Sequence, residues 1–414
     1  MKKMKVHLLD GAKIKASYVL SVLRTLCDEA GVEVVDTPDE ADALWVSMYD
    51  QDSLPVLKKA REMAGDRLVI MGGFEAWCAP PYLAWADAAV VGEGWEFIEA
   101  WGRDPAEALA LPCVCKKDST EILPSYVVPW ERFPLTKMPP GHHYYFMGGR
   151  GCRNKCKFCM TSWIQPNSNC PPEVIARAVE YVEQQPKGKL TIVTNDSQAV
   201  IESKVVNAQS VTVRAYLDEP ERYKSNMLHF GIEGWTEADR ARLGKPISDD
   251  MLRELQIVTG ENKQQCEFFF IVGYPGYKES DVWEFIDNVA MPDARLYPRI
   301  FVKCTYFNPA PYTPYQRTPF IESYIDRERI LREFHVRQKR VRMFPKRSPG
   351  REAWRCVIRR ATAEEAILIG NQPNWPDAPG TVERFAERLR KVGLEHLLSW
   401  EGPYPYEIIK TRIR

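Results

Sequence analysis

The sequence predicts an α/β protein: a Rossmann-like, doubly wound parallel sheet, then an open partial barrel, then a mainly helical region. Three observations support this prediction. Strand-like and helix-like stretches alternate in residues 1–105, and they alternate again in residues 141–320. Residues 106–140 separate the two sets as a proline-rich connector with little periodicity. Strands alternating with helices are typical of parallel sheets, and 414 residues suffice for two or three domains.

Residues 1–105 carry the pattern of the doubly wound sheet. The expected strands are short apolar runs at 6–10, 32–36, 43–49, 67–73 and 88–94, and the expected helices are 17–31 and 52–64. Ligands on such sheets bind beyond the carboxyl ends of the strands. Three glycine-containing stretches fall at those ends: Asp10-Gly11, Gly72-Gly73-Phe74 and Gly92-Glu93-Gly94.

Residues 141–320 carry the pattern of the partial barrel. The expected strands are 143–149, 189–195, 210–217, 226–233, 266–276 and 299–309, and the expected helices are 172–184, 249–259 and 279–290. Six strands are too few for a closed eight-stranded barrel, so we expect an open one. Residues 321–414 are expected to be mainly helical.

The composition excludes several classes of protein. Lys+Arg and Asp+Glu both total 56, so net charge alone indicates no partner. No apolar run is long enough to span a membrane, and the basic amino terminus lacks a secretory h-region. Eleven cysteines without a secretory signal argue against a disulfide scaffold, so a cytoplasmic location is expected.

Three cysteines carry the clearest chemical signal. Cys152, Cys156 and Cys159 lie within eight residues on a glycine-rich stretch after the first barrel strand. Thiolates are the usual ligands of iron–sulfur clusters, and three ligands for four irons leave one iron open for chemistry. A structural zinc site with Cys170 as fourth ligand is an alternative, as are three incidental cysteines.

The pattern C-x₃-C-x-Φ-C, with Phe158 as the aromatic residue, resembles the signature of the radical S-adenosylmethionine (SAM) superfamily. That resemblance implies a partial (β/α)₆ barrel and a [4Fe–4S] cluster held by Cys152, Cys156 and Cys159. It implies reductive cleavage of SAM to methionine and a 5′-deoxyadenosyl radical that abstracts a substrate hydrogen. It also implies a flavodoxin- or ferredoxin-type electron donor.

The same resemblance implies further cofactor-contact residues in the barrel segment. FFFIVGYPG (268–276) is similar to the strand that lies along the adenine, and the stretch from Asn308 is similar to the turn after strand six. Asn195-Asp196 stands where many members carry a GGE stretch, which is a departure. The implied SAM-contact residues are Phe158, Asn195, Asp196, Arg214, Glu233, Gly273, Pro275, Gly276 and Asn308.

Cys304 and Tyr306 are candidate catalytic residues on the last barrel strand. They share one face by strand alternation, and they could donate hydrogen to a product radical if that face is inward. The alternative is packing in the core.

The amino-terminal sheet resembles the cobalamin-binding domain that precedes the barrel in one branch of the superfamily. MGGFEAW (71–77) and VVGEGWEF (90–97) are the most similar stretches. The D-x-H-x-x-G cobalt-ligand motif is absent, because no histidine follows Asp10-Gly11 and His7 lies within the strand. The domain therefore either binds cobalamin without that ligand or serves as a scaffold.

Residues 327–360 are strongly basic, with thirteen Lys or Arg and three acids. Arginine interleaved with aromatic residues suits phosphate contact and base stacking. The run could also receive an acidic electron donor, or it could be a solvated helix face.

Three functions follow. The first is a radical SAM enzyme acting on a phosphate-rich substrate, such as a base in nucleic acid. The second is a cobalamin-dependent radical SAM methyltransferase acting on a small molecule or peptide. The third is a non-enzymatic metal-binding module.

Overall fold

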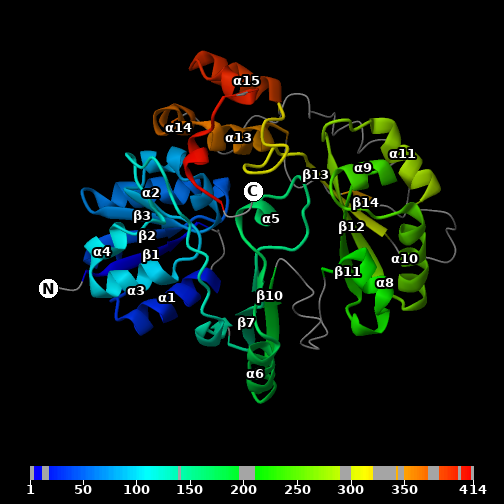
Figure 1. The fold of residues 1–414 in the computed structure, drawn as a ribbon, viewed down its shortest axis with the longest axis horizontal. Coiled ribbons are helices and arrows are strands. Elements are labelled where there is room, and N and C mark those ends of the chain that lie inside the picture. The colour runs from blue at the N-terminus through cyan, green and yellow to red at the C-terminus, as the bar shows by residue number, and fades with distance from the viewer. Residues whose placement is uncertain are drawn as a thin grey trace.

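The computed structural model describes residues 4–11, 18–138, 141–194, 210–289, 300–319, 342–343, 349–371, 382–399 and 402–411. Figure 1 shows the amino-terminal sheet on the left, a second set of strands and helices on the right, and the carboxyl-terminal helices above the first sheet. The carboxyl-terminal end returns to the middle of the molecule, beside the short helix α5 (Thr161–Ile164).

The amino-terminal sheet has the order β1-β2-β3-β4-β5, in which only β5 is antiparallel. Its strands are β1 (Val6–Asp10), β2 (Ala43–Ser47), β3 (Leu68–Gly72), β4 (Ala88–Val90) and β5 (Val114–Cys115). The expected strand at 32–36 is reduced to a single parallel bridge between Val34 and Val6. That bridge lies on the side of β1 away from β2, so the strand order of the sheet reverses at β1. The sheet is therefore doubly wound, as predicted.

Successive side chains of these strands point to opposite faces of the sheet and pack into two separate cores. Trp45 and Ile70 pack with α1 (Tyr18–Ala30) and α3 (Trp95–Arg103) on one face. Leu44 and Val69 pack with α2 (Leu54–Ala64) and the carboxyl-terminal helices on the other. A large apolar side chain contributes about 1.5–3 kcal/mol when fully buried. The carboxyl-terminal region is thus built into the core of the amino-terminal domain.

The connector contributes one strand to the amino-terminal sheet and one to the first sheet of the barrel segment. It begins at α4 (Pro105–Leu109), supplies β5 to the first sheet, and supplies β6 (Thr136–Met138) antiparallel to the first barrel strand. Tyr126 from the connector also packs against the amino-terminal core.

The barrel segment forms two parallel arrangements. One sheet has the order β10-β7-β6, and the other has the order β11-β12-β13-β14. The strands are β7 (His143–Met147), β10 (Lys189–Val193), β11 (Met227–Glu233), β12 (Gln265–Val272), β13 (Ile300–Tyr306) and β14 (Arg342–Met343). Residues 195–209, which separate β10 from the next elements, lie outside the described part of the chain.

The expected strand at 210–217 is wrong. Ser210 makes one parallel bridge to His229, and the chain then enters α8 (Val213–Asp218). Thr212 caps that helix because its side chain accepts a hydrogen bond from the Ala215 N–H. The composition of residues 210–217 favours a strand, but the cap at Thr212 starts a helix there instead.

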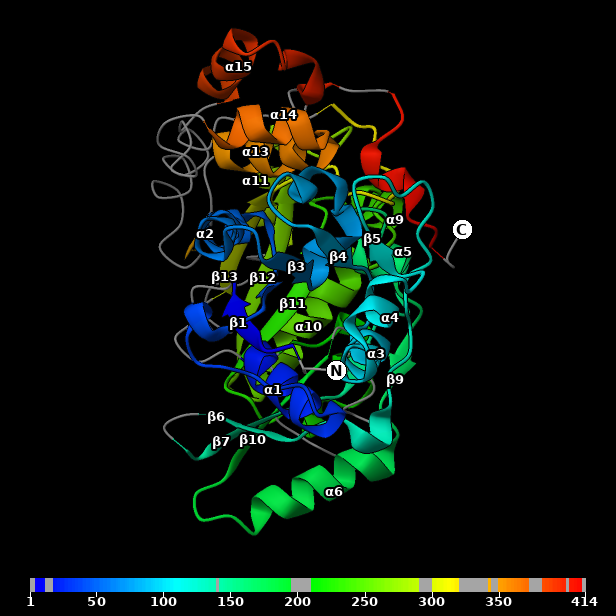
Figure 2. The same ribbon diagram turned by 90° about the vertical axis from the view of Figure 1, so that its left-hand side faces the viewer.

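The remaining helices follow the predicted pattern. The barrel helices are α6 (Pro172–Glu183), α9 (Glu237–Arg242), α10 (Asp249–Glu261) and α11 (Glu279–Asn288). The carboxyl-terminal helices are α13 (Pro349–Arg360), α14 (Ala363–Gly370) and α15 (Val382–Lys391). Short 3₁₀ helices occupy Pro38–Glu40, Gln51–Ser53, Phe74–Cys78, Pro80–Ala84, Trp130–Arg132, Pro220–Arg222, Glu395–Leu398 and Pro405–Ile408. Figure 2 shows α15 and α6 at opposite ends of the molecule. Among the described residues, no helix has the length and hydropathy to cross a bilayer.

Candidate active site

The three cysteines lie on a loop closed by a small hairpin. Strands β8 (Gly149–Arg150) and β9 (Ser168–Asn169) pair antiparallel and bring the two ends of this cysteine loop (residues 151–167) together. Gly151 has φ +65°, and a Cβ there would lie 2.2 Å from the Pro166 carbonyl oxygen. Only glycine fits this turn.

Within the loop, Cys156 is buried, and Cys152 and Cys159 are half-buried. Burial raises the pKa of Cys156 to about 11, and the neighbouring Cys159 and Cys152 thiols add to the rise. In the described part of the chain, no three His, Cys, Asp or Glu side chains are gathered closely enough to hold a metal ion. The cluster therefore stays a prediction that rests on residue type, spacing and the closed loop.

Cys170, the fourth ligand of the zinc alternative, packs elsewhere. It is 2% exposed and belongs to the apolar core that includes Val174 and Ile175 of α6. Burial raises the pKa of its thiol to about 12. This environment is that of a packed core cysteine.

One carboxylate of the amino-terminal domain holds both ends of the cysteine loop. Glu93, from the Gly92-Glu93-Gly94 stretch after β4, is 5% exposed. It pairs with Arg150 at 3.1 Å and accepts a hydrogen bond from Gln165 Nε2 at 2.8 Å. The sequence indicated this position only as the end of a strand, and it gave no sign of the partner.

The barrel domain contacts the same loop from the other side. The Lys157 N–H donates to the Leu243 carbonyl oxygen at 2.9 Å. Gly244 has φ +83°, and a Cβ there would lie 2.9 Å from the Lys155 carbonyl oxygen. The cysteine loop is therefore fixed between the first sheet and the segment that follows α9.

A half-buried ion pair lies next to that contact. Glu233 ends β11 at a register shift, with φ +71°, and its carboxylate lies 2.9 Å from Lys245 Nζ. Lys245 also donates to the Gly231 carbonyl oxygen at 3.0 Å and lies 6.0 Å from the Phe158 ring centroid. Burial pulls the pKa of Lys245 down, but Glu233 and the Cys156 thiol outweigh it and hold the pKa above 10.5. A carboxylate and an ammonium side by side suit a ligand carrying both an amino and a carboxylate group.

The strand-five motif forms a tight turn beyond β12. Gly273 and Gly276 both have φ +80°, and Pro275 lies between them. A Cβ on Gly276 would collide with the Arg242 guanidinium. The Arg242 guanidinium therefore lies against the backbone of this turn, where only glycine leaves room for it.

Other predicted contact residues do not converge on this place. Arg214 is exposed on α8 and not on a barrel strand, because the cap at Thr212 starts a helix there. Asn308 donates to the Glu352 carbonyl oxygen of α13 at 3.2 Å. Asn195 and Asp196 lie outside the described residues.

Cys304 and Tyr306 lie on the helix-covered face of β13. Cys304 pairs in register with Phe270, whose ring centroid lies 4.9 Å from that of Phe285 on α11. Cys304 is 3% exposed and Tyr306 is 7% exposed, within the core that also holds Val282. Both side chains are packed in this core, and their role as hydrogen donors stays a prediction.

The opposite face of the same strands is charged. Glu267 on β12 lies 2.6 Å from Lys303 on β13 and 3.3 Å from His229 on β11. The Phe269 ring lies beside both Lys303 and the His229 ring. Sequence reasoning missed this cluster because each member is a single polar residue in an apolar run.

The carboxyl edge of the amino-terminal sheet is the candidate cobalamin site. A Cβ on Gly72 would meet nothing within 4 Å, and Tyr49 beyond β2 is 68% exposed. A large planar ligand fits such an open glycine edge. His7 is the second residue of β1 and lies away from this carboxyl edge, with its Nδ1 3.0 Å from the Val35 carbonyl oxygen.

Helix α13 covers the rest of that edge with its arginines. Arg351 pairs with Asp52 at 3.0 Å, Arg355 contacts Gln51 at 2.6 Å, and Arg359 pairs with the fully buried Glu75. Arg360 donates to the Leu398 carbonyl oxygen at 2.9 Å. These four cations bind within the molecule, while residues 327–341 and 344–348 of the basic run lie outside the described part.

No protein-family model and no curated protein matches the sequence. Among solved structures, the chain is similar to the radical SAM methyltransferase TsrM from Kitasatospora setae, solved with tryptophan and a SAM analogue. The TM-score is 0.51 at 13% identity, and the match covers 77% of this chain and 76% of that chain. This chain has a radical SAM fold. Because residues 141–320 are less than half of the 414, the likeness extends beyond the barrel segment.

The radical SAM fold is also that of OxsB, a cobalamin-dependent SAM radical enzyme solved with aqua-cobalamin. The TM-score is 0.50 at 12% identity, and the match covers 69% of this chain. The chain spans about half of the OxsB chain, 52%. The predicted resemblance to the branch with an amino-terminal cobalamin-binding-like domain is thereby confirmed at the level of fold.

Proposed function

We propose that this chain is a radical SAM enzyme that works with cobalamin, and that methyl transfer is its reaction class. The observation that carries the proposal is the position of the cysteine loop, held by Glu93 on one side and by the Leu243–Lys245 segment on the other. TsrM is a methyltransferase and OxsB is cobalamin-dependent, which supports the assignment.

The cofactors supply the hard chemistry: the [4Fe–4S] cluster with SAM supplies one-electron cleavage, and cobalamin supplies methyl transfer. The chain supplies ligands and orientation. Cys152, Cys156 and Cys159 hold the cluster. Glu233 and Lys245 would bind the amino and carboxylate groups of SAM, and residues 273–276 would contact its adenine.

Cobalamin would lie at the carboxyl edge of the amino-terminal sheet, on the side left open beside Gly72 and Tyr49. Among the described residues, no histidine lies at this carboxyl edge, since His7 is the second residue of β1. The site would therefore hold cobalamin without a histidine ligand from this edge.

A small molecule or peptide is the favoured substrate class. The arginines of α13 that are described bind acids and carbonyl groups of the same chain, so they are not available for phosphate contact. The phosphate-rich substrate rests only on the part of the basic run outside the described residues.

Cobalamin uptake after anaerobic reconstitution tests this proposal. The purified chain should retain visible bands of cobalamin beside the broad iron–sulfur shoulder. Gly72→Leu fills the open edge without backbone strain, because Gly72 does not have a positive φ and its Cβ meets nothing. This variant should lose cobalamin while keeping iron content and unfolding temperature. Equal uptake by both proteins, or none by the wild-type chain, would contradict the assignment.

A further inference from the structure

A charged cluster lies on the face of strands β11, β12 and β13 opposite helices α10 and α11 (Figure 1). Cys304 and Phe270 point to the helix-covered face, so Glu267 and Lys303 point to the other one. Glu267 Oε1 lies 2.6 Å from Lys303 Nζ, and Glu267 Oε2 lies 3.3 Å from His229 Nε2. We call Glu267, Lys303 and His229 the strand cluster.

The ion pair of Glu233 and Lys245 lies on the same face, nearer to the cysteine loop. A Cβ on Gly231 would collide with Lys245 Nζ and with the Glu233 carboxylate, so this pair packs against Gly231. Gly231 and His229 are two residues apart on β11, which places them on one face about 7 Å apart. Phe269 pairs in register with Gly231, and its ring centroid lies 5.8 Å from that of His229. The Phe269 ring therefore lies between the two charged groups.

The strand cluster has more hydrogen-bond donors than acceptors. A lysine ammonium has three N–H donors, and within the described residues Lys303 Nζ has one acceptor, the Glu267 carboxylate. That carboxylate is shared with His229. The side chains of Lys303 and His229 are each 27% exposed, whereas that of Glu267 is 8% exposed. A ligand that enters from solvent therefore meets the donors first, and an anionic oxygen group is the ligand that pairs with them.

We propose that the strand cluster binds the substrate, and that this substrate carries a carboxylate next to an apolar or aromatic group. The carboxylate accepts hydrogen bonds from Lys303, and the apolar group packs on the Phe269 ring, toward Glu233 and Lys245. This inference rests on the proposed function, because it takes Glu233 and Lys245 as the SAM site and a small molecule or peptide as the substrate.

The charge of the strand cluster favours a carboxylate over a phosphate. One lysine, one histidine and one carboxylate give at most one net positive charge, reached when His229 is protonated. A phosphate monoester carries about −1.5 to −2 at neutral pH, so the Glu267 carboxylate on the same donors would repel it more strongly than a carboxylate.

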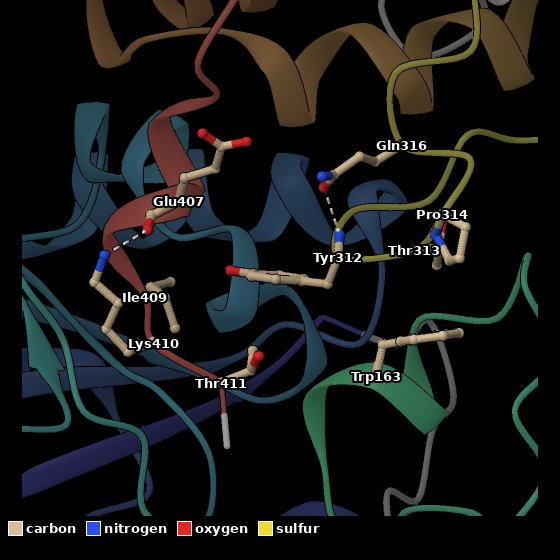
Figure 3. Close-up of a pocket in the computed structure, with 9 residues that line it drawn as sticks. All are labelled: Trp163, Tyr312, Thr313, Pro314, Gln316, Glu407, Ile409, Lys410 and Thr411. Carbon is tan, nitrogen blue, oxygen red and sulfur yellow. Dashed lines mark hydrogen bonds between the residues drawn. The ribbon is translucent and has the colours of Figure 1, made fainter. Parts of the chain in front are cut away.

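A pocket beside the cysteine loop contains a competing cation (Figure 3). It has a volume of about 540 Å³ and lies between Trp163 of α5 and the carboxyl-terminal residues. Its lysine, Lys410, lies 3.5 Å from the Glu407 carbonyl oxygen, and the Glu407 carboxylate on the same wall pairs with Arg317 at 2.9 Å. This pocket shares no lining residue with the strand cluster, so a variant at Lys410 separates the two sites.

The test compares a carboxylate probe with its neutral amide on the reconstituted full-length chain, with SAM present. Binding of para-fluorophenylacetate and of para-fluorophenylacetamide is followed by fluorine NMR. Lys303→Gln removes the proposed cation, and Glu267→Gln removes the acid that competes for it. Lys410→Gln is the matched control, because it makes the same change in the pocket of Figure 3.

The wild-type chain should bind the acid about tenfold more tightly than the amide, which is the size expected for hydrogen bonds to a charged group. Lys303→Gln should bind both probes alike, and Lys410→Gln should match the wild type. Glu267→Gln should bind the acid more tightly than the wild type, because Lys303 then has no carboxylate of the chain to pair with. If Lys303→Gln does not fold, this gain in Glu267→Gln carries the test, since a purely structural cluster predicts a loss in both variants.

Equal binding of acid and amide by the wild-type chain would overturn the proposal, as would weaker binding of the acid by Glu267→Gln. Loss of the preference in Lys410→Gln would also overturn it, and would assign the acid to the pocket of Figure 3. Displacement of the probe by SAM would place it on Glu233 and Lys245 instead of the strand cluster. Failure of the proposed function looks different, because then the wild-type chain takes up no cobalamin and forms no 5′-deoxyadenosine, whichever probe it binds.

Discussion

Helix α13 and the cysteine loop are both rich in cations, yet the fold uses them in opposite ways. The α13 arginines face acids at the carboxyl edge of the amino-terminal sheet, and Arg359 binds the fully buried Glu75. The cations of the cysteine loop are exposed, in a segment without acids. A basic run in a sequence therefore does not by itself indicate a binding surface, because acids of the facing elements can pair with its cations, as they do in α13.

The largest expected effect is on stability, at the inner end of α13. Arg359→Met leaves the Glu75 carboxylate buried without its cation, and breaking such a pair costs about 3–5 kcal/mol. Urea unfolding measures the loss. Arg351→Met is the matched control, because its pair with Asp52 is partly exposed and is worth at most about 1 kcal/mol. Equal costs for both variants would break the distinction between buried and surface cations in α13.

The second expected effect is on the cysteine loop, whose ends depend on Glu93. Glu93→Ala removes the partner of both Arg150 and Gln165, which should cost about 1–3 kcal/mol. The reconstituted variant should also lose iron faster than the wild-type chain during gel filtration. Glu96→Ala is the control, since Glu96 accepts from Ser125 and does not touch the loop. Normal iron retention by Glu93→Ala would show that the amino-terminal domain does not hold the loop.

The smallest expected effect concerns Lys245, the half-buried cation beside the loop. Its pKa is higher in the folded chain than its usual 10.5, so its ion pair with Glu233 contributes fully at neutral pH. The contribution is lost as the pH rises through the folded-state pKa. Lys245→Met should therefore be less stable than the wild type at neutral pH, and the gap should narrow above about pH 10.5. A gap that is independent of pH would mean that packing, and not charge, is what Lys245 provides.

Much of the fold could be predicted from periodicity. Four of the five expected strands of the amino-terminal sheet and five of the six expected barrel strands lie within a few residues of their predicted positions, whereas β5 falls in the predicted connector. These segments bury one or both faces, and a buried face requires apolar residues at regular spacing, which the sequence shows. The two misplaced strands are edge or terminal stretches: 32–36 retains one bridge, and 210–217 becomes a capped helix.

The contacts that build the candidate site could be predicted only in part. Cys152, Cys156 and Cys159 are local in sequence, so their spacing reveals them. The contact between Glu93 and Gln165 joins residues 72 positions apart, and no local pattern encodes it. The face on which Cys304 lies also depends on which side of β13 the helix α11 covers, and strand alternation leaves that choice open.

The central claim is that the cysteine loop holds a cluster that cleaves SAM. Its most direct test is 5′-deoxyadenosine production by the reconstituted chain, incubated anaerobically with SAM and dithionite. The wild-type chain and Cys170→Ala should both form 5′-deoxyadenosine, because Cys170 packs in an apolar core. Cys156→Ala should form none. No product from the wild-type chain, or loss of iron and activity in Cys170→Ala, would contradict the account.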